Sequence, residues 1–244
     1  MQLYDWLKSE DLAHLYEAIQ QCEELLVQTV GDWPRVHKVA CHFHKMLVHV
    51  YLAGEGWILS DVLDVLRAER FGARSHQEQT RKDAAGTPYI VHPLQVATLL
   101  LTTAKVRNHE VLIAALLHDT VEDTPVTIDE IKEQFGSTVQ NFVAEVTDDP
   151  DLDWISRKDM QVASAKDLSS GAAQIKLADK YCNLRDILHH PPKKWSFQRA
   201  DGYVRWAQQV VERLPWVNAN LQRLLSELFN EYHSSCHRNE TKGH

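Results

Sequence analysis

The sequence predicts an all-α protein, and three observations lead to that prediction. Apolar residues recur at spacings of three and four, as at Leu12, Leu15 and Ile19, which places them on one face of a helix. Thr127 and Glu130 form a capping box, which is typical of a helix N-terminus. No segment shows the sustained apolar–polar alternation of half-buried strands. A bundle of helices is therefore expected.

Breaks in the apolar pattern divide the chain into elements. Glycine and proline interrupt it at residues 31–34 and 54–56, and Gly136 lies where the helix that starts at the capping box should end. Polar turns or loops are expected at residues 81–88 and 148–151. Helices are expected, in order, over residues 12–26, 35–53, 60 onward, 93–103, 114–123, 128–135 and 172–188, with one or two closing helices over residues 200–232.

The predicted organisation has three parts. Residues 1–60 form a helical N-terminal extension, residues 61–233 form the main domain, and residues 234–244 form a polar, disordered tail. A chain of 244 residues suits one large domain with an appendage. The apolar stripe of the extension must pack either on the main domain or on another chain. In the second case the extension would form a homo-oligomer.

Composition argues against several classes of function. The formal net charge is −8, whereas sequence-independent binding to nucleic acid needs a positive face, so no nucleic-acid partner is expected. No apolar run reaches the roughly 18 residues of a membrane span, and the N-terminus lacks the order of a signal peptide. We therefore expect a cytoplasmic protein without a membrane partner.

The four cysteines stand far apart with no CxxC pair, which argues against a thiolate zinc site and a disulfide framework.

The stretch AALLHDTVEDT, residues 114–124, carries the strongest chemical signal. An apolar run ends in His118 and Asp119. Glu122 lies four residues after His118 and three after Asp119, so a helix would place all three on one broad face. Asp123 follows four residues after Asp119. Because burying carboxylates without partners is costly, a metal ion is expected. Imidazole with carboxylate suits zinc, manganese or ferrous iron better than calcium.

Two ligands are too few for such an ion, and other segments offer more. His92 stands just before Pro93 at a helix entrance, and Asp179 interrupts an apolar stripe. Each signal has a plainer alternative. An isolated His–Asp pair is more often a capping or surface pair, and Asp179 taken alone would more often form a salt bridge with Lys176 or Lys180.

Several motifs occur together in one order, namely GTPYIVHP at 86–93, ALLHDTVEDT at 115–124, KLADKYCNLRD at 176–186 and WSFQRADGYVRWAQQVV at 195–211. With them, residues 73–210 resemble the HD-domain alarmone hydrolases, the hydrolase half of the RelA/SpoT enzymes. The resemblance is closest to their short stand-alone form, the metazoan SpoT homologues and small alarmone hydrolases. It implies an HD-domain helical bundle, preceded here by an N-terminal helical extension that these relatives lack.

The resemblance also implies roles for individual residues. The metal ligands would be His92, His118, Asp119 and Asp179, holding one Mn²⁺ ion, although ligand chemistry alone does not choose manganese. Glu122 and Asp123 would be the catalytic carboxylates that activate the attacking water. His76 would brace the site, with a plain packing role as the alternative.

The implied substrates are the alarmones ppGpp and pppGpp of the stringent response, cleaved by a 3′-pyrophosphohydrolase to GDP or GTP and pyrophosphate. The matching substrate-binding residues are Arg81, Lys82, Asn183, Arg199 and Tyr203. The sequence departs from its relatives in the acidic stretch around Trp154, where they often supply a lysine to the phosphates. Lys158 is a candidate to replace that lysine.

Two other readings stay open for the sequence. The same fold could act on (p)ppApp or on another 3′- or 2′-phosphorylated nucleotide such as NADPH. Alternatively, the domain could bind an alarmone without turnover, a reading that the complete set of ligands and carboxylates disfavours. In each case the partner is a small nucleotide.

Overall fold

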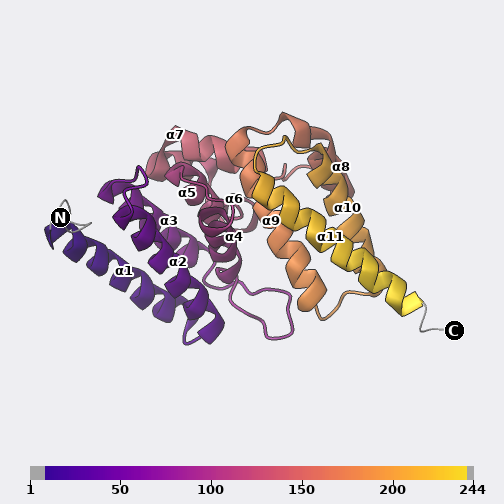
Figure 1. The fold of residues 1–244 in the computed structure, drawn as a ribbon, viewed down its shortest axis with the longest axis horizontal. Coiled ribbons are helices and arrows are strands. Elements are labelled where there is room, and N and C mark those ends of the chain that lie inside the picture. Colours follow the sequence, from indigo (N-terminus) through magenta and orange to yellow (C-terminus); the bar gives the residue numbers. More distant parts are fainter. Residues whose placement is uncertain (1–8, 241–244) are drawn as a thin grey trace. The chain divides into compact units, whose positions relative to one another are not determined.

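The chain is all-helical in a computed structural model that describes residues 9–240, with side chains described for residues 10–234 (Figure 1). Within that range the β structure is limited to an isolated bridge between Thr80 and Pro88. The predicted fold class is thus confirmed. The helices are α1 Ser9–Val30, α2 Pro34–Leu52, α3 Leu59–Ser75, α4 Val91–Thr102, α5 His109–Leu117, α6 Thr120–Asp123, α7 Ile128–Val146, α8 Trp154–Ser164, α9 Ser170–His189, α10 Phe197–Arg213 and α11 Ala219–Glu240, with a 3₁₀ turn at Ala165–Asp167.

The chain divides into two compact units. Unit 1 contains the described residues up to Arg81 together with Gly86–Thr147, and unit 2 contains Lys82–Ala85 with the chain from Asp148 onward. The predicted boundary near residue 60 lies inside unit 1 rather than between the two units. No helix in the described part of the chain is both long and apolar enough to cross a membrane.

Unit 1 is built around α4 and α5. Both helices are apolar on nearly all sides, and side chains such as Leu100 and Leu116 are fully buried. Helix α5 contacts α3, α4 and α7, and α2 covers α4. The C-terminal end of α5, where the His–Asp pair begins, is therefore held from several sides.

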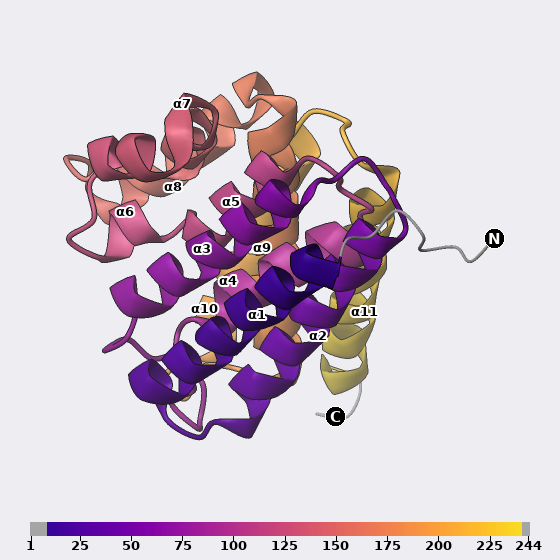
Figure 2. The same cartoon turned by 90° about the vertical axis from the view of Figure 1, so that its left-hand side faces the viewer.

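The N-terminal extension packs on this core. Helix α1 lies along α3 and α2 (Figure 2), and its stripe residues Leu15, Cys22 and Leu26 are buried. Helix α2 adds the buried Phe43 and Leu47. The apolar stripe whose exposure would have favoured association is thus covered by the chain itself. Homo-oligomerisation through the extension stays a prediction.

Helix α7 shows how the capping and glycine signals operate. The Thr127 hydroxyl accepts a hydrogen bond from the Glu130 amide, and the Glu130 carboxylate accepts one from the Thr127 amide, so the predicted capping box is confirmed. Gly136 has φ +86°, a conformation that glycine adopts without steric cost. It interrupts the helix where the sequence predicted an end, but the chain resumes helical structure and continues to Val146.

Unit 2 is centred on α9, which contacts α10 and α11. Ser169 caps the start of α9, and its end at His189 precedes Pro191, as predicted. Helix α11 continues to Glu240, so residues 234–240 of the predicted tail are helical. Buried Leu221 and Leu225 anchor this helix, and no glycine or proline interrupts it between Ala219 and Glu240. The rest of the predicted tail lies outside the described residues.

Candidate metal centre and active site

The His118–Asp119 pair lies at a break between two helices. The sequence predicted one continuous helix, but α5 ends at Leu117 and α6 begins at Thr120. Two features mark the break. The Thr120 hydroxyl donates to the Leu117 carbonyl at 2.6 Å, and Asp119 has φ −98° and ψ −4°, away from helical values. The turn lets two adjacent side chains approach each other, which a regular helix would hold about 100° apart.

Three predicted ligands meet at this turn. His118 Nε2 lies 3.1 Å from Asp119 Oδ2, and His92 Nε2 lies 3.7 Å from the same oxygen. One potential ligand atom from each residue lies within 4.8 Å of the other two. Ligand atoms that sit about 2.1 Å from one ion are themselves roughly 3 Å apart, so these separations fit a shared ion. Both histidines are buried, whereas the Asp119 side chain is one-fifth exposed.

The orientation of His118 is set by the backbone. Its Nδ1 lies 2.7 Å from the Ala115 carbonyl oxygen. Because a carbonyl can only accept, Nδ1 carries the proton and Nε2 is the nitrogen that can bind a cation. His92 is positioned differently, by the first turn of α4, where Pro93 is tolerated because its missing amide has no helical partner to lose.

Tyr89 supports Asp119 from outside the ligand group. Its hydroxyl donates to Asp119 Oδ2 at 2.6 Å. Burial and the neighbouring Asp119 raise the pKa of Tyr89 well above its usual value, so the phenol keeps the proton it donates. The sequence reasoning missed Tyr89, although its place three residues before His92 in the YIVHP motif could have indicated it.

His76 contacts Tyr89. The two rings lie 4.9 Å apart between centroids, and His76 Nδ1 is 2.7 Å from Gln79 Oε1. The Gln79 amide donates in turn to the Asp123 carbonyl. Burial lowers the pKa of His76, which favours the neutral ring. His76 thus links the Asp119 side of the site to the carboxylate turn.

Tyr89→Phe is expected to weaken metal binding by about 10- to 100-fold, the usual cost of removing a hydrogen bond that supports a metal ligand. The ring and its contact with His76 remain, so the fold should be unchanged. Competition with a chelator measures the affinity, and circular dichroism checks the fold. Tyr16→Phe is the matched control, because Tyr16 is 70% exposed. Equal metal affinities for the two variants would contradict the role of Tyr89.

Glu122 and Asp123 occupy α6, directly after the ligands. Both side chains are exposed, and neither belongs to the group that could hold a metal. The Asp123 amide donates to the Asp119 carbonyl at 2.9 Å, which fixes the turn. The two carboxylates are therefore accessible to water and follow the ligand cluster within one short helix.

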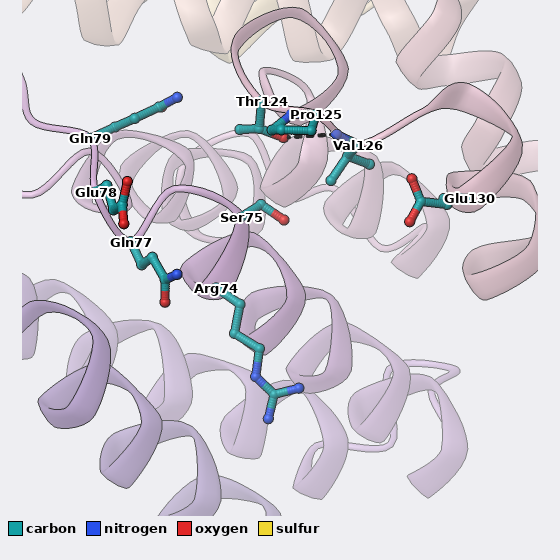
Figure 3. A pocket seen from close by; sticks show the side chains of 9 residues that line it. All are labelled: Arg74, Ser75, Gln77, Glu78, Gln79, Thr124, Pro125, Val126 and Glu130. Carbon is teal, nitrogen blue, oxygen red and sulfur yellow. Dashed lines mark hydrogen bonds between the residues drawn. The ribbon is translucent and has the colours of Figure 1, made fainter.

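A hollow of about 470 Å³ lies beside this turn in unit 1. Figure 3 shows the residues that line it, which come from the end of α3 and the loop after it, from the segment that follows α6, and from the start of α7. Its lining residues are Arg74, Ser75, Gln77, Glu78, Gln79, Thr124, Pro125, Val126 and Glu130. None of the three clustered ligands and none of the predicted substrate-binding residues lines it. We therefore assign no substrate to this hollow.

In unit 2, Asp179 is a buried carboxylate of α9 with two side-chain donors. Lys180 Nζ lies 3.1 Å from Oδ2, and the Asn183 amide donates to Oδ1 at 2.6 Å. The plainer reading of Asp179, a salt bridge with Lys180, is thus present. Such support is also what an ion-binding carboxylate requires. Asp179 as a metal ligand and Asn183 as a nucleoside contact stay predictions.

Lys158 lies in an aromatic cluster of unit 2. Its Nζ is 3.3 Å from the ring centroid of Trp206, 5.0 Å from that of Tyr203 and 5.3 Å from that of Trp154. Burial and the nearby charge of Lys180 lower the pKa of Lys158 to about 8. The sequence reasoning did not single out Trp206. Trp206 follows Tyr203 by one helical turn, a spacing that could have indicated it.

Arg199 and Tyr203 both lie close to the ring of Trp195. The Arg199 guanidinium lies 4.7 Å from the Trp195 ring centroid, and the Trp195 and Tyr203 rings are 5.7 Å apart.

In unit 1, the Arg81 guanidinium lies 5.5 Å from the Tyr89 ring. Lys82 is exposed in unit 2, where its carbonyl accepts from the Lys193 amide. Substrate contacts by these residues stay predictions.

Comparison with known proteins identifies the family. A model of the HD domain matches residues 68–204, which include the three clustered ligands, the carboxylate turn and Asp179. The chain is an HD-domain protein. The match begins inside α3, so α1 and α2 of this HD-domain protein precede it.

Relatives of this HD-domain protein are similar over most of their own length. It is 47% identical over 172 residues to the guanosine-3′,5′-bis(diphosphate) 3′-pyrophosphohydrolase MESH1 of Homo sapiens, covering 70% of this chain and 96% of MESH1. MESH1 of Drosophila melanogaster is 43% identical over 162 residues, covering 66% and 90%. A solved structure described as a metazoan ortholog of SpoT that hydrolyzes ppGpp superimposes with a TM-score of 0.68 at 41% identity, covering 69% and 95%. The predicted resemblance is confirmed.

Proposed function

We propose that this HD-domain protein hydrolyses the 3′-diphosphate of guanosine alarmones, converting ppGpp or pppGpp to GDP or GTP and pyrophosphate. The observation that carries the proposal is the cluster of His92, His118 and Asp119, followed at once by two exposed carboxylates. The 47% identity to human MESH1 over 96% of its length selects the substrate class. A nucleotide is accordingly the partner of this chain.

The proposed metal is one manganese ion held by His92, His118, Asp119 and Asp179. The donor set fits a divalent transition metal, because it offers two neutral imidazoles and carboxylates. His118 presents Nε2 in the required tautomer, and Tyr89 orients Asp119. When bound, such an ion screens the charge of a diphosphate, polarises a phosphoryl oxygen and lowers the pKa of water.

Glu122 and Asp123 are proposed to accept the proton of the attacking water and to orient it. A carboxylate can do this only while it stays ionised and within hydrogen-bond reach of the water. Both side chains are exposed, which favours the ionised form. The hydrogen bond from Gln79 to the Asp123 carbonyl holds the turn that carries them.

Substrate binding is proposed to use charge for the phosphates and rings for the nucleoside. Arg81, Lys82 and Lys158 supply the cations. Asn183, Arg199 and Tyr203 are assigned to the nucleoside. The aromatic cluster of unit 2 offers π-faces, and stacking of a base on an aromatic ring contributes about 1–3 kcal/mol.

The preference for guanine or adenine is tested by measuring hydrolysis of ppGpp, ppApp and NADPH in the presence of manganese. We expect kcat/KM for ppGpp at least about tenfold above that for ppApp, a difference of roughly 1.4 kcal/mol. An asparagine can pair with either base after an amide flip, so Asn183 does not decide this preference by itself. Chromatography identifies the products, and His118→Ala provides the background rate.

Other outcomes of this panel would replace the proposal. A preference for ppApp would make the protein an adenosine alarmone hydrolase, and release of phosphate from NADPH would make it a phosphatase of another nucleotide. The exposed Trp154 beside Lys158 is the observation that favours a changed substrate. Tight binding of ppGpp without turnover would make it a binding module.

A further inference from the structure

A second cluster of metal-ligating side chains lies between the first three helices. Cys22 of α1, His44 of α2 and Glu69 of α3 meet in the interior of unit 1. Their side chains are almost completely buried, with 1% of Cys22, 3% of His44 and 1% of Glu69 exposed. Cysteine is often buried as a thiol, but histidine and glutamate are rarely buried to this extent unless they pair with each other or bind a cation.

The ligand atoms of the cluster are close enough to share one ion. One atom from each residue lies within 4.8 Å of the other two, and His44 Nε2 is 2.8 Å from Glu69 Oε2. The Cys22 thiol donates to the Leu66 carbonyl at 3.5 Å. At the edge of the cluster, Glu23 Oε1 lies 3.9 Å from His44 Nδ1. An imidazole binds an ion through one nitrogen, so with Nε2 directed at Glu69 this half-exposed carboxylate would orient the ring from the Nδ1 side and would not be a ligand.

Two buried atoms of the cluster lack hydrogen bonds. Glu69 Oε1 and His44 Nδ1 have no hydrogen-bond partner among the described residues. Buried polar atoms almost always have one, because an unsatisfied atom loses the water it bonded to in the unfolded chain. Of the two, Glu69 Oε1 belongs to the carboxylate that approaches His44 Nε2, and its missing partner points to a ligand at this carboxylate.

We propose that Cys22, His44 and Glu69 bind a structural zinc ion that joins the N-terminal helices to the first helix of the HD-domain match. Thiolate, imidazole and carboxylate are the donors that zinc takes in proteins. Binding would displace the thiol proton of Cys22, and any proton of His44, into solvent. This site contains sulfur, whereas the proposed catalytic centre contains only nitrogen and oxygen donors.

The competing interpretation is a buried ion pair between His44 and Glu69. Burial lowers the pKa of His44, but the carboxylates Glu69 and Glu23 together more than offset this, so the pKa of His44 is raised. Burial and Glu69 also raise the pKa of the Cys22 thiol, so in this interpretation the thiol stays protonated. The two interpretations therefore differ in whether Cys22 can become a thiolate ligand.

Binding of Co²⁺ to the full-length chain distinguishes the zinc site from the ion pair. Co²⁺ bound by a thiolate shows a sulfur-to-metal charge-transfer band in the near ultraviolet, and Co²⁺ at the His–Asp centre does not. We expect this band in the wild-type protein, its loss in Cys22→Ser, and its retention in Asp119→Ala. Cys182→Ser is the matched control, because Cys182 is also fully buried, in α9. Added Zn²⁺ should abolish the band and raise the Tm of the wild type more than that of Cys22→Ser.

The wild-type spectrum decides the proposal even if a variant fails to fold. Absence of a sulfur band from folded wild-type protein would leave the ion pair as the correct interpretation. A band that persists in folded Cys22→Ser would assign the sulfur to another cysteine and overturn the site. Alarmone hydrolysis is measured separately, so failure of the zinc site and failure of the proposed function are distinguishable.

Discussion

Asp119→Ala is expected to remove both the manganese ion and the alarmone hydrolase activity. The Asp119 carboxylate is the one anionic group of the cluster that it forms with His92 and His118, and both histidines approach its Oδ2. Without it, two neutral imidazoles face the cation. Metal catalysis contributes several kcal/mol to transition-state stabilisation, so turnover should fall by about 10³-fold or more.

Elemental analysis for manganese and steady-state hydrolysis of ppGpp measure the two losses. Asp129→Ala is the matched control, because Asp129 is exposed in the first turn of α7 and lies outside the ligand cluster. It should keep both properties. A manganese content in Asp119→Ala equal to that of the wild type would show that the ion is held elsewhere.

The double variant Glu122→Gln/Asp123→Asn is expected to keep the metal and lose the rate. The substitutions preserve shape but remove the base, and removal of a positioned base typically lowers turnover by about 10²- to 10⁴-fold. Neither side chain belongs to the ligand cluster, so manganese content and ppGpp affinity should change little.

Single-turnover kinetics and equilibrium binding of ppGpp separate these effects. The matched control is Asp129→Asn/Glu133→Gln, which makes the same chemical changes at two exposed positions of α7. Wild-type turnover by Glu122→Gln/Asp123→Asn would place the base on another residue. Loss of manganese from this variant would instead make one of the two carboxylates a ligand.

Most of the helical structure could be predicted because its signals are local. Periodic apolar residues and the Thr127–Glu130 capping box act within a few residues of themselves, and the structure confirms both. The break between α5 and α6 was not predictable in this way. Every residue from Leu117 to Thr120 is compatible with a helix, and the break is marked by the ψ angle of −4° at Asp119, which no local pattern specifies.

The candidate metal centre was predictable only in part. The motifs indicated His92, His118 and Asp119, and the structure brings these three together. Tyr89 and Gln79 were not indicated, because their roles are hydrogen bonds to a side chain 30 residues away and to a backbone carbonyl 44 residues away. Such contacts leave no spacing pattern in the sequence.

By itself, the sequence determined that this protein is helical, that its apolar faces must be buried, and that His118 and Asp119 lie next to each other. These properties follow from local geometry and from the free energy of burying apolar side chains. Only the tertiary structure decided which distant residues meet. The lone cysteine of α1 carried no signal in the sequence, yet helix packing places Cys22 beside His44 and Glu69. Neighbours across helices depend on how side chains on three separate faces interdigitate, which no single stretch of sequence specifies.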